Sequence, residues 1–191
     1  YLNLNNLYSL TVLTADNNQL LDLDVSQCPL LEVLTCSNNN LLNINITGCE
    51  FLKEFDASHN QLTSFSFLTD PSMTEAITNN SANNNNVVFS CHSKLESIDL
   101  SHNLLTDIIL QGAPLQHNSF PNGNYPASSL NLSNNFLTQI NFDESQVKNV
   151  DVSYNLLSTL NFGGNCNTVL YNLSANNNDL THISFGNGVG S

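Results

Sequence analysis

The sequence predicts a repeat solenoid, a single stack of short coils that spans residues 1–191. An eleven-residue frame, LxxLxLxxNxL, returns along the chain, and a second alternation of apolar residues follows nearly every copy. The copy at residues 10–20 recurs 21 residues later at 31–41, and after 21 more at 52–62. Self-similarity at a short period is typical of stacked coils, because no coil can bury its apolar face alone.

The ninth position of the frame is Asn in every copy, including a degenerate fourth one. A turn inside a stack leaves backbone groups without water, and an Asn amide can satisfy them with both donors and an acceptor. We therefore expect all of these Asn side chains to be buried in turns. The eight copies are 10–20, 31–41, 52–62, 77–87, 95–105, 127–137, 147–157 and 170–180, with Asn18, Asn39, Asn60, Asn85, Asn103, Asn135, Asn155 and Asn178 at position nine.

The spacing within the frame predicts a short strand. Positions four and six should point into the core, while positions three, five and seven point outward. The second alternation, for example Leu23 with Val25, predicts that the opposite wall is extended too, since a 21-residue coil has little room for a helix. We expect a parallel sheet on the concave side and short extended or turn segments on the convex side.

The frame resembles the leucine-rich-repeat superfamily. The segments LDVS at 23–26 and LTCSNN at 34–39 are similar to the short bacterial repeats of internalin-like surface proteins. This resemblance covers nearly the whole chain, and it implies a superhelix that selects its ligand through variable outward positions. Two stretches depart from the frame, 63–94 and 111–126, and we expect both to form irregular projecting loops.

Composition narrows the choice of partners. The net charge is -13, with 3 Lys and no Arg, so the chain cannot neutralise a run of phosphates, and nucleic acid is excluded as a partner. No apolar run approaches the roughly 20 residues of a membrane span, and the first residues lack the pattern of a signal peptide. Because the chain also begins without Met, we expect it to be a mature or excised piece of a longer protein.

The chain has 5 Cys and no CxxC motif, and its 5 His are scattered along the sequence, so we expect neither a metal site nor a cofactor. The cysteines suit a narrow core as small buried thiols. One disulfide stays open as an alternative, between Cys28 and Cys49, which hold equivalent places on adjacent coils about 5 Å apart.

Four N-glycosylation sequons occur, which composition alone would produce in a chain with 35 Asn and 35 Ser plus Thr. They are weak evidence for glycosylation, and two of them lie on the predicted ligand face. Their acceptor residues are Asn45, Asn79, Asn131 and Asn172.

The outward face predicts a surface of hydroxyls and amides with a few carboxylates. We expect ligand contacts from this face and from the loop at 111–126. Glu54 and Asp56 point the same way on one predicted strand, as the two carboxylates of a glycosidase would, but no sugar-stacking aromatic residue accompanies them, and we expect no enzyme. We expect no calcium site either, because the aspartates sit on alternate coils, about 10 Å apart. The expected ligand-facing residues are Glu54, Asp56, His59, Asp99, His102, Asp151 and Tyr154.

Three functions remain open from the sequence. The first is an extracellular or cell-surface recognition and adhesion module that binds a protein or a glycan. The second is a structural subunit that binds other copies of itself end to end, giving a filament. The third is an ice-binding face, although its columns of Thr, Ser and Asn are mixed.

Overall fold

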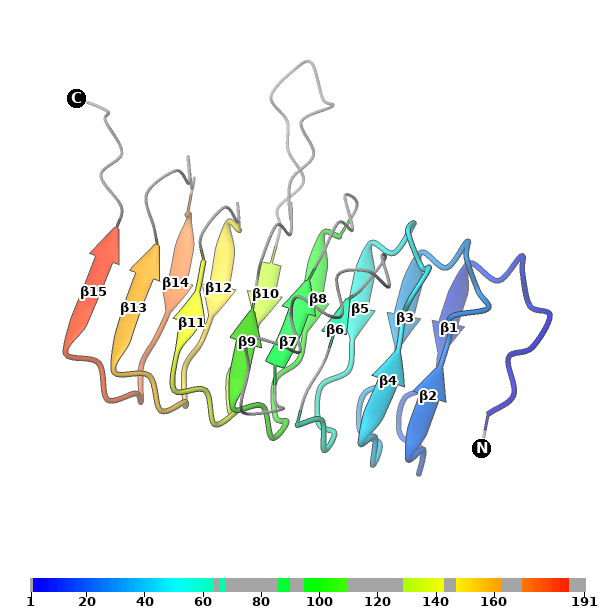
Figure 1. Cartoon of the computed structure of the whole chain (residues 1–191), viewed down its shortest axis with the longest axis horizontal. Helices are drawn as coiled ribbons and strands as arrows, with labels where there is room; N and C mark the ends of the chain where they lie inside the picture. Colours follow the sequence, from blue (N-terminus) through cyan, green and yellow to red (C-terminus); the bar gives the residue numbers. More distant parts are fainter. Residues whose placement is uncertain are drawn as a thin grey trace, which may run out of the picture.

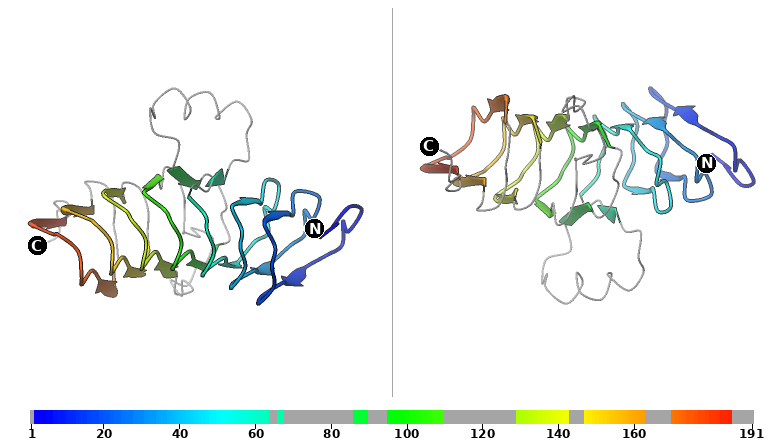
Figure 2. Two further views of the ribbon diagram at one scale, coloured as in Figure 1. Left: turned by 90° about the horizontal axis from the view of Figure 1, so that it is seen from below. Right: turned by 90° about the horizontal axis from the view of Figure 1, so that it is seen from above.

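A computed structural model of the chain describes residues 2–63, 66–67, 86–89, 95–109, 129–142, 147–162 and 170–185. Over these residues the fold is an elongated stack of coils with a wall of parallel strands on each side (Figures 1 and 2). The described residues contain no helix, and hence none that could cross a membrane. The predicted repeat solenoid with extended segments on both walls is confirmed.

The larger wall is a seven-stranded parallel sheet with the order β1-β3-β5-β8-β10-β12-β14. Each strand takes positions three to five of one frame, and position four is the inward residue, as in the register Leu34↔Phe55 and Phe55↔Ile98. The strands are β1 (Val12–Thr14), β3 (Val33–Thr35), β5 (Glu54–Asp56), β8 (Ser97–Asp99), β10 (Ser129–Asn131), β12 (Asn149–Asp151) and β14 (Asn172–Ser174).

The opposite wall is built mainly from the second alternation of the coils. It consists of a two-stranded parallel sheet, β2-β4, and a six-stranded one with the order β15-β13-β11-β9-β7-β6. The strands are β2 (Asp22–Asp24), β4 (Asn43–Asn45), β6 (Ser66–Phe67), β7 (Asn86–Phe89), β9 (Asp107–Ile109), β11 (Ile140–Asn141), β13 (Thr159–Phe162) and β15 (His182–Phe185).

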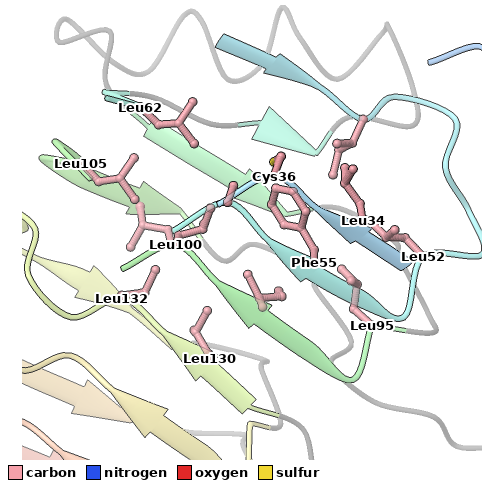
Figure 3. Close-up of a cluster of buried hydrophobic side chains, with 14 of the residues drawn as sticks. Leu34, Cys36, Leu52, Phe55, Leu62, Leu95, Leu100, Leu105, Leu130 and Leu132 are labelled. Atoms are coloured by element: carbon pink, nitrogen blue, oxygen red, sulfur yellow. The ribbon is translucent and has the colours of Figure 1, made fainter. Parts of the chain in front are cut away.

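Apolar side chains from both walls fill the space between them. Leu34, Phe55 and Leu100 are buried in the region shown in Figure 3, where side chains of successive coils lie next to one another. Burying a Leu or Phe side chain stabilises the fold by roughly 1.5–3 kcal/mol, so the stack gains stability with every coil. On the opposite wall, the rings of Phe142 and Phe162 stack with their centroids 4.7 Å apart.

The ninth-position amides form an asparagine ladder that joins each coil to the one before it. Asn60 is buried; its Oδ1 accepts a hydrogen bond from the Leu41 backbone N at 2.9 Å, and its Nδ2 donates to the Cys36 carbonyl at 3.0 Å. It also donates to the carbonyl of Ala57 in its own coil at 3.1 Å. The same arrangement recurs at the buried amides Asn39, Asn103, Asn135 and Asn155.

The expectation that every ladder amide is buried is wrong at the two ends. Asn18 is exposed and donates only within its own coil, to the carbonyls of Ala15 and Asp16. Asn178 bonds to the preceding coil but is half-buried, because no coil covers it from the other side within the described residues. An amide of the ladder is fully buried only when coils pack against both of its sides.

The degenerate fourth copy, 77–87, does not supply a strand to the seven-stranded sheet, in which β5 and β8 are direct neighbours. Part of it lies in β7 of the opposite wall instead, where Val87 is in register with Ile108. The physical reason is visible in the frame: position four of this copy is Asn80, a polar residue where the core requires an apolar one. The predicted count of eight coils is therefore wrong for this sheet. Asn85 and most of the two predicted loops, 63–94 and 111–126, lie outside the described residues.

Candidate functional site on the outer face of the seven-stranded sheet

The outer face of the seven-stranded sheet carries all the side chains expected to face a ligand. Glu54 is exposed at position three of β5, and the three aspartates are half-buried at position five of β5, β8 and β12. The remaining three side chains are exposed at position eight, in the turns that follow these strands: His59, His102 and Tyr154.

The aspartates lie closer together than the sequence indicated. Asp56 and Asp99 are register partners on adjacent strands, so the expected separation of about 10 Å is wrong for this pair. Asn131 and Asp151 follow on the next two strands. We call these four residues, Asp56, Asp99, Asn131 and Asp151, the acidic row. The error arose because the fourth copy was counted as a strand between β5 and β8.

Each side chain of the acidic row also closes the turn behind its own strand. The carboxylates of Asp56 and Asp99 accept hydrogen bonds from the backbone N of Ser58 and Ser101, both at 2.9 Å. Asp99 additionally accepts from Asn131 Nδ2 at 2.9 Å. Such turns fix the orientation of the carboxylates, so the negative charge is held in place along the sheet.

Position seven differs from its predicted orientation. The Ser side chains at this position were expected to point outward, but in the four central coils they are buried beneath the row. The chain already turns at this residue, so its side chain no longer follows the alternation of the strand. The buried residues are Ser58, Ser101, Ser133 and Ser153.

The backbone at position eight adopts a left-handed conformation in every described coil of this sheet, with φ between 52° and 57°. Asn and His tolerate this region better than most residues, whereas a Tyr is uncommon there and costs about 1 kcal/mol. The conformation is held by the next coil, for example by the hydrogen bond from the Tyr154 backbone N to the Asn176 carbonyl at 2.9 Å. The column is Asn17, Asn38, His59, His102, Asn134, Tyr154 and Asn177.

Two neighbouring residues of this column form an imidazole pair. The rings of His59 and His102 are stacked with centroids 4.1 Å apart and planes 10° from parallel. They belong to two copies of one short motif, Asp-x-Ser-His-Asn, at 56–60 and 99–103. The motif is visible in the sequence, but the proximity of its copies was missed because the fourth copy was placed between them.

Sequence reasoning also missed an exposed apolar surface at position ten. Leu104, Phe136 and Leu156 lie on three consecutive coils and are 41%, 49% and 49% exposed. Backbone hydrogen bonds join these coils beside them, from Phe136 N to the Leu105 carbonyl and from Leu156 N to the Leu137 carbonyl. We call these three residues the apolar edge. The signal was available, since the other described coils have Gln19, Asn40, Gln61 and Asp179 at the same position.

The described residues contain no group of three or more His, Cys, Asp or Glu side chains placed to hold a metal ion. Glu54 and Asp56 are separated along β5 by the inward-facing Phe55. The Oδ1 atom of Asp56 accepts the hydrogen bond of the turn described above. Within the described part of the chain, this face presents carboxylates whose orientation is fixed by the turns.

The sequon residues have different surroundings. Asn45 is exposed on β4, and its Oδ1 accepts from the Thr47 backbone N at 3.1 Å. Asn131 is half-buried and its Nδ2 donates a hydrogen bond to Asp99, so a glycan would be attached to a nitrogen that already takes part in the acidic row. Asn172 is exposed and donates to Asn149 Oδ1 at 2.6 Å, while Asn79 lies outside the described residues.

The cysteines of the described residues are free, buried thiols at Cys28, Cys36 and Cys49. The Cys49 Sγ donates to the Val25 carbonyl at 3.4 Å, and burial raises the pKa of this thiol to about 12. Burial, reinforced by the charge of Asp56, also raises the pKa of Cys36. Of the two alternatives for Cys28 and Cys49, buried thiols or a disulfide, the structure has buried thiols.

Comparison with known proteins gives a limited result. No family model matches the chain, and no curated protein sequence matches it. Among solved structures, the chain is similar to one described as "Functional domain of InlJ from Listeria monocytogenes includes a cysteine ladder", with 19% identity and a TM-score of 0.40. The match covers 96% of this chain and 55% of that one, so this chain spans about half the length of the solved protein.

Proposed function

We propose that this chain is a non-catalytic recognition module that binds a protein through the outer face of its seven-stranded sheet. The observation that carries the proposal is that the coils of β8, β10 and β12 carry the exposed apolar edge together with three residues of the acidic row and the exposed Tyr154. Protein interfaces combine an apolar, aromatic centre with a charged rim, and a glycan would need fewer aliphatic contacts. Of the two ligand classes left open by the sequence, these residues favour a protein.

The charge of the chain narrows the chemistry of the partner. The whole sequence carries 16 Asp and Glu against 3 Lys, and the acidic row holds its carboxylates fixed toward the outside. A partner surface with Lys or Arg residues around an apolar side chain would be attracted to this face and oriented on it. We therefore infer that the partner is basic where it contacts the chain.

The rigidity of the stack supports a binding role. The backbone of the ligand-facing turns is held by hydrogen bonds between coils, such as His59 N to the Ser101 carbonyl and His102 N to the Ser133 carbonyl, both at 3.0 Å. A surface fixed before binding loses little conformational entropy when the partner docks. The resemblance of the repeats to those of surface proteins supports an extracellular or cell-surface location for this adhesion role.

Selection of random peptides displayed on phage against the immobilised chain tests the proposal. We expect enrichment of peptides that combine Lys or Arg with aliphatic or aromatic residues, and loss of their binding in the variant Phe136→Asp. Leu42→Asp is the matched control, because Leu42 is 48% exposed on a coil outside the apolar edge. Enrichment of acidic peptides, equal loss in both variants, or binding confined to a glycan array would overturn the proposal.

Self-association is a second candidate, favoured by the direction of the asparagine ladder. Every described ladder amide after Asn18 bonds to the coil before it. The Leu180 N–H and the Ala175 carbonyl therefore stand where a following Asn would bind, and the described residues hold no such Asn. The last coil also leaves Ile183 and Phe185 41% and 61% exposed. Another copy could stack on this face. Light scattering of the 191-residue chain should then show a mass that grows with concentration, and a constant monomer mass would exclude it.

A further inference from the structure

We propose that His59 and His102 together form a binding site for one divalent transition-metal ion. The site is independent of the protein-binding role proposed above. It depends on the direct pairing of β5 with β8, which brings the two copies of the Asp-x-Ser-His-Asn motif onto adjacent coils. The sequence alone, with its 5 scattered His, gives no indication of this site.

The spacing of the two rings, once they splay, suits a shared ion. A zinc ion holds imidazole nitrogens at about 2.0–2.1 Å, so two ligating nitrogens stand at most about 4.2 Å apart. The ring centroids of His59 and His102 are 4.1 Å apart, with the planes 10° from parallel. The rings must splay to point one nitrogen each at the ion, and both side chains are exposed and can reorient.

Hydrogen bonds between coils fix the backbone from which the two rings project. Both residues have left-handed φ angles, 53° and 52°, and each backbone N bonds to the next coil at 3.0 Å. No hydrogen-bond partner of either imidazole lies within the described residues. Asp56 and Asp99, three residues earlier in each motif, bond to the backbone of Ser58 and Ser101 instead. The ring nitrogens thus remain available as ligands.

The donor set determines which ions bind. Neutral imidazole is a ligand for Zn²⁺, Cu²⁺ and Ni²⁺, whereas Ca²⁺ and Mg²⁺ require oxygen ligands. Since the described residues offer no third His, Cys, Asp or Glu at the pair, water completes the coordination shell. Such an open site leaves positions for a ligand from another molecule.

The two histidines could instead have a purely structural role in their turns. Asn occupies the same column in four of its seven described residues, so His59 and His102 could simply satisfy a left-handed turn, as Asn38 and Asn134 do. This equivalence supplies a clean test, because His→Asn at either position retains the residue type that the turn prefers while it removes the ligand.

Calorimetric titration of the 191-residue chain with ZnCl₂ alone, with MgCl₂ as the selectivity control, measures the binding. We expect one Zn²⁺ to bind per chain and no binding of Mg²⁺. The variants His59→Asn and His102→Asn should each lose at least roughly tenfold in Zn²⁺ affinity, because loss of a residue that merely supports a metal ligand already reduces affinity by about that factor. His182→Asn, on β15, is the control that should leave the affinity unchanged.

The imidazole resonances provide a readout besides affinity. In NMR spectra, Zn²⁺ should shift the ring signals of His59 and His102 and leave those of His182 in place. Undiminished Zn²⁺ binding by the double variant His59→Asn/His102→Asn would overturn the proposal. So would the absence of Zn²⁺ binding by the unmodified chain, or equal ring shifts at His182.

Discussion

Asn103 bonds directly to the coil of Asn60: its Oδ1 accepts from the Leu62 backbone N at 3.0 Å, and its Nδ2 donates to the Ala57 carbonyl at 3.0 Å. These two bonds join residues 41 and 46 positions apart in the sequence. The ladder therefore passes over the degenerate copy without a break. The same step brings Asp56 beside Asp99 and His59 beside His102, so the candidate site exists because of it.

Replacing a central ladder amide should destabilise the whole stack. Asn60→Ala leaves the Leu41 N–H buried without its side-chain partner and removes one of the two Asn side chains that donate to the Cys36 carbonyl. The free energy of unfolding should therefore fall by about 1–3 kcal/mol. The measurement is the midpoint of urea denaturation. Asn18→Ala is the control, because Asn18 is exposed and bonds only within its own coil, and it should have a smaller effect. An unchanged midpoint for Asn60→Ala would refute the ladder's role.

The passage of the ladder over the degenerate copy gives a second prediction. Asn103→Ala should destabilise the chain by about 1–3 kcal/mol, since Asn103 serves the Leu62 N–H and the Ala57 carbonyl. Asn85→Ala should cost less than about 0.5 kcal/mol, because Asn103 occupies the ladder place that Asn85 would otherwise hold. Urea denaturation of both variants compares them directly. Similar losses in both would mean that the fourth copy takes part in the ladder.

The sequence predicted most of the fold because the determinants are local. The inward residues Leu34 and Phe55, the ladder amide Asn60 and the extended opposite wall all follow from one frame with a period-two pattern. Each coil repeats the same packing problem, so one solution serves throughout the stack.

The site was less predictable because it depends on which coils are neighbours. The columns at positions five and eight, which include Asp56, His59 and Tyr154, are exposed or half-buried as expected, whereas the column at position seven is buried in four coils. The pairing of His59 with His102 could not be predicted from the columns alone. Its prediction depends on recognising that the fourth copy, with a polar residue at position four, supplies no strand to the sheet. The apolar edge was missed for another reason: position ten lies outside the strand, where the alternation rule gives no orientation.

Burial should protect the thiols from reagents. Cys49 is buried and its pKa is raised to about 12, so at pH 8 almost none of it is thiolate, the reactive form. We expect iodoacetamide to leave Cys36 and Cys49 unmodified in the folded chain and to modify both in urea. Mass spectrometry of the Cys-containing peptides measures this. Rapid alkylation of Cys49 in the folded state would contradict its placement in the core.

The same burial predicts a dependence of stability on pH. The folded pKa of Cys49, about 12, lies above its ordinary value of 9.0, so the unfolded chain releases this proton more easily. The stabilising contribution is complete below pH 9 and is lost as the pH rises toward 12. The free energy of unfolding should therefore fall more steeply over this range in the unmodified chain than in Cys49→Ala. Equal slopes for the two proteins would show that Cys49 does not contribute.

Tyr154 should lower the stability of the fold while it contributes to binding. Its φ of 54° lies in the left-handed region that Asn adopts at the equivalent positions of neighbouring coils, Asn134 and Asn177. Tyr154→Asn should therefore raise the free energy of unfolding by about 0.5–1 kcal/mol, because it relieves backbone strain without removing a buried side chain. Asn134→Tyr, the reverse change one coil away, should lower it by a similar amount.

The binding side of this exchange can be measured with the same variant. Tyr154 is 54% exposed beside the apolar edge, so Tyr154→Asn should weaken peptides selected on the unmodified chain by at least about fivefold, the loss of roughly 1 kcal/mol at an aromatic contact. Urea denaturation and peptide titration together separate the two effects. A variant that is more stable and binds less would show that the strain at Tyr154 is retained for recognition, whereas a less stable variant would place Tyr154 among the structural residues of the turn.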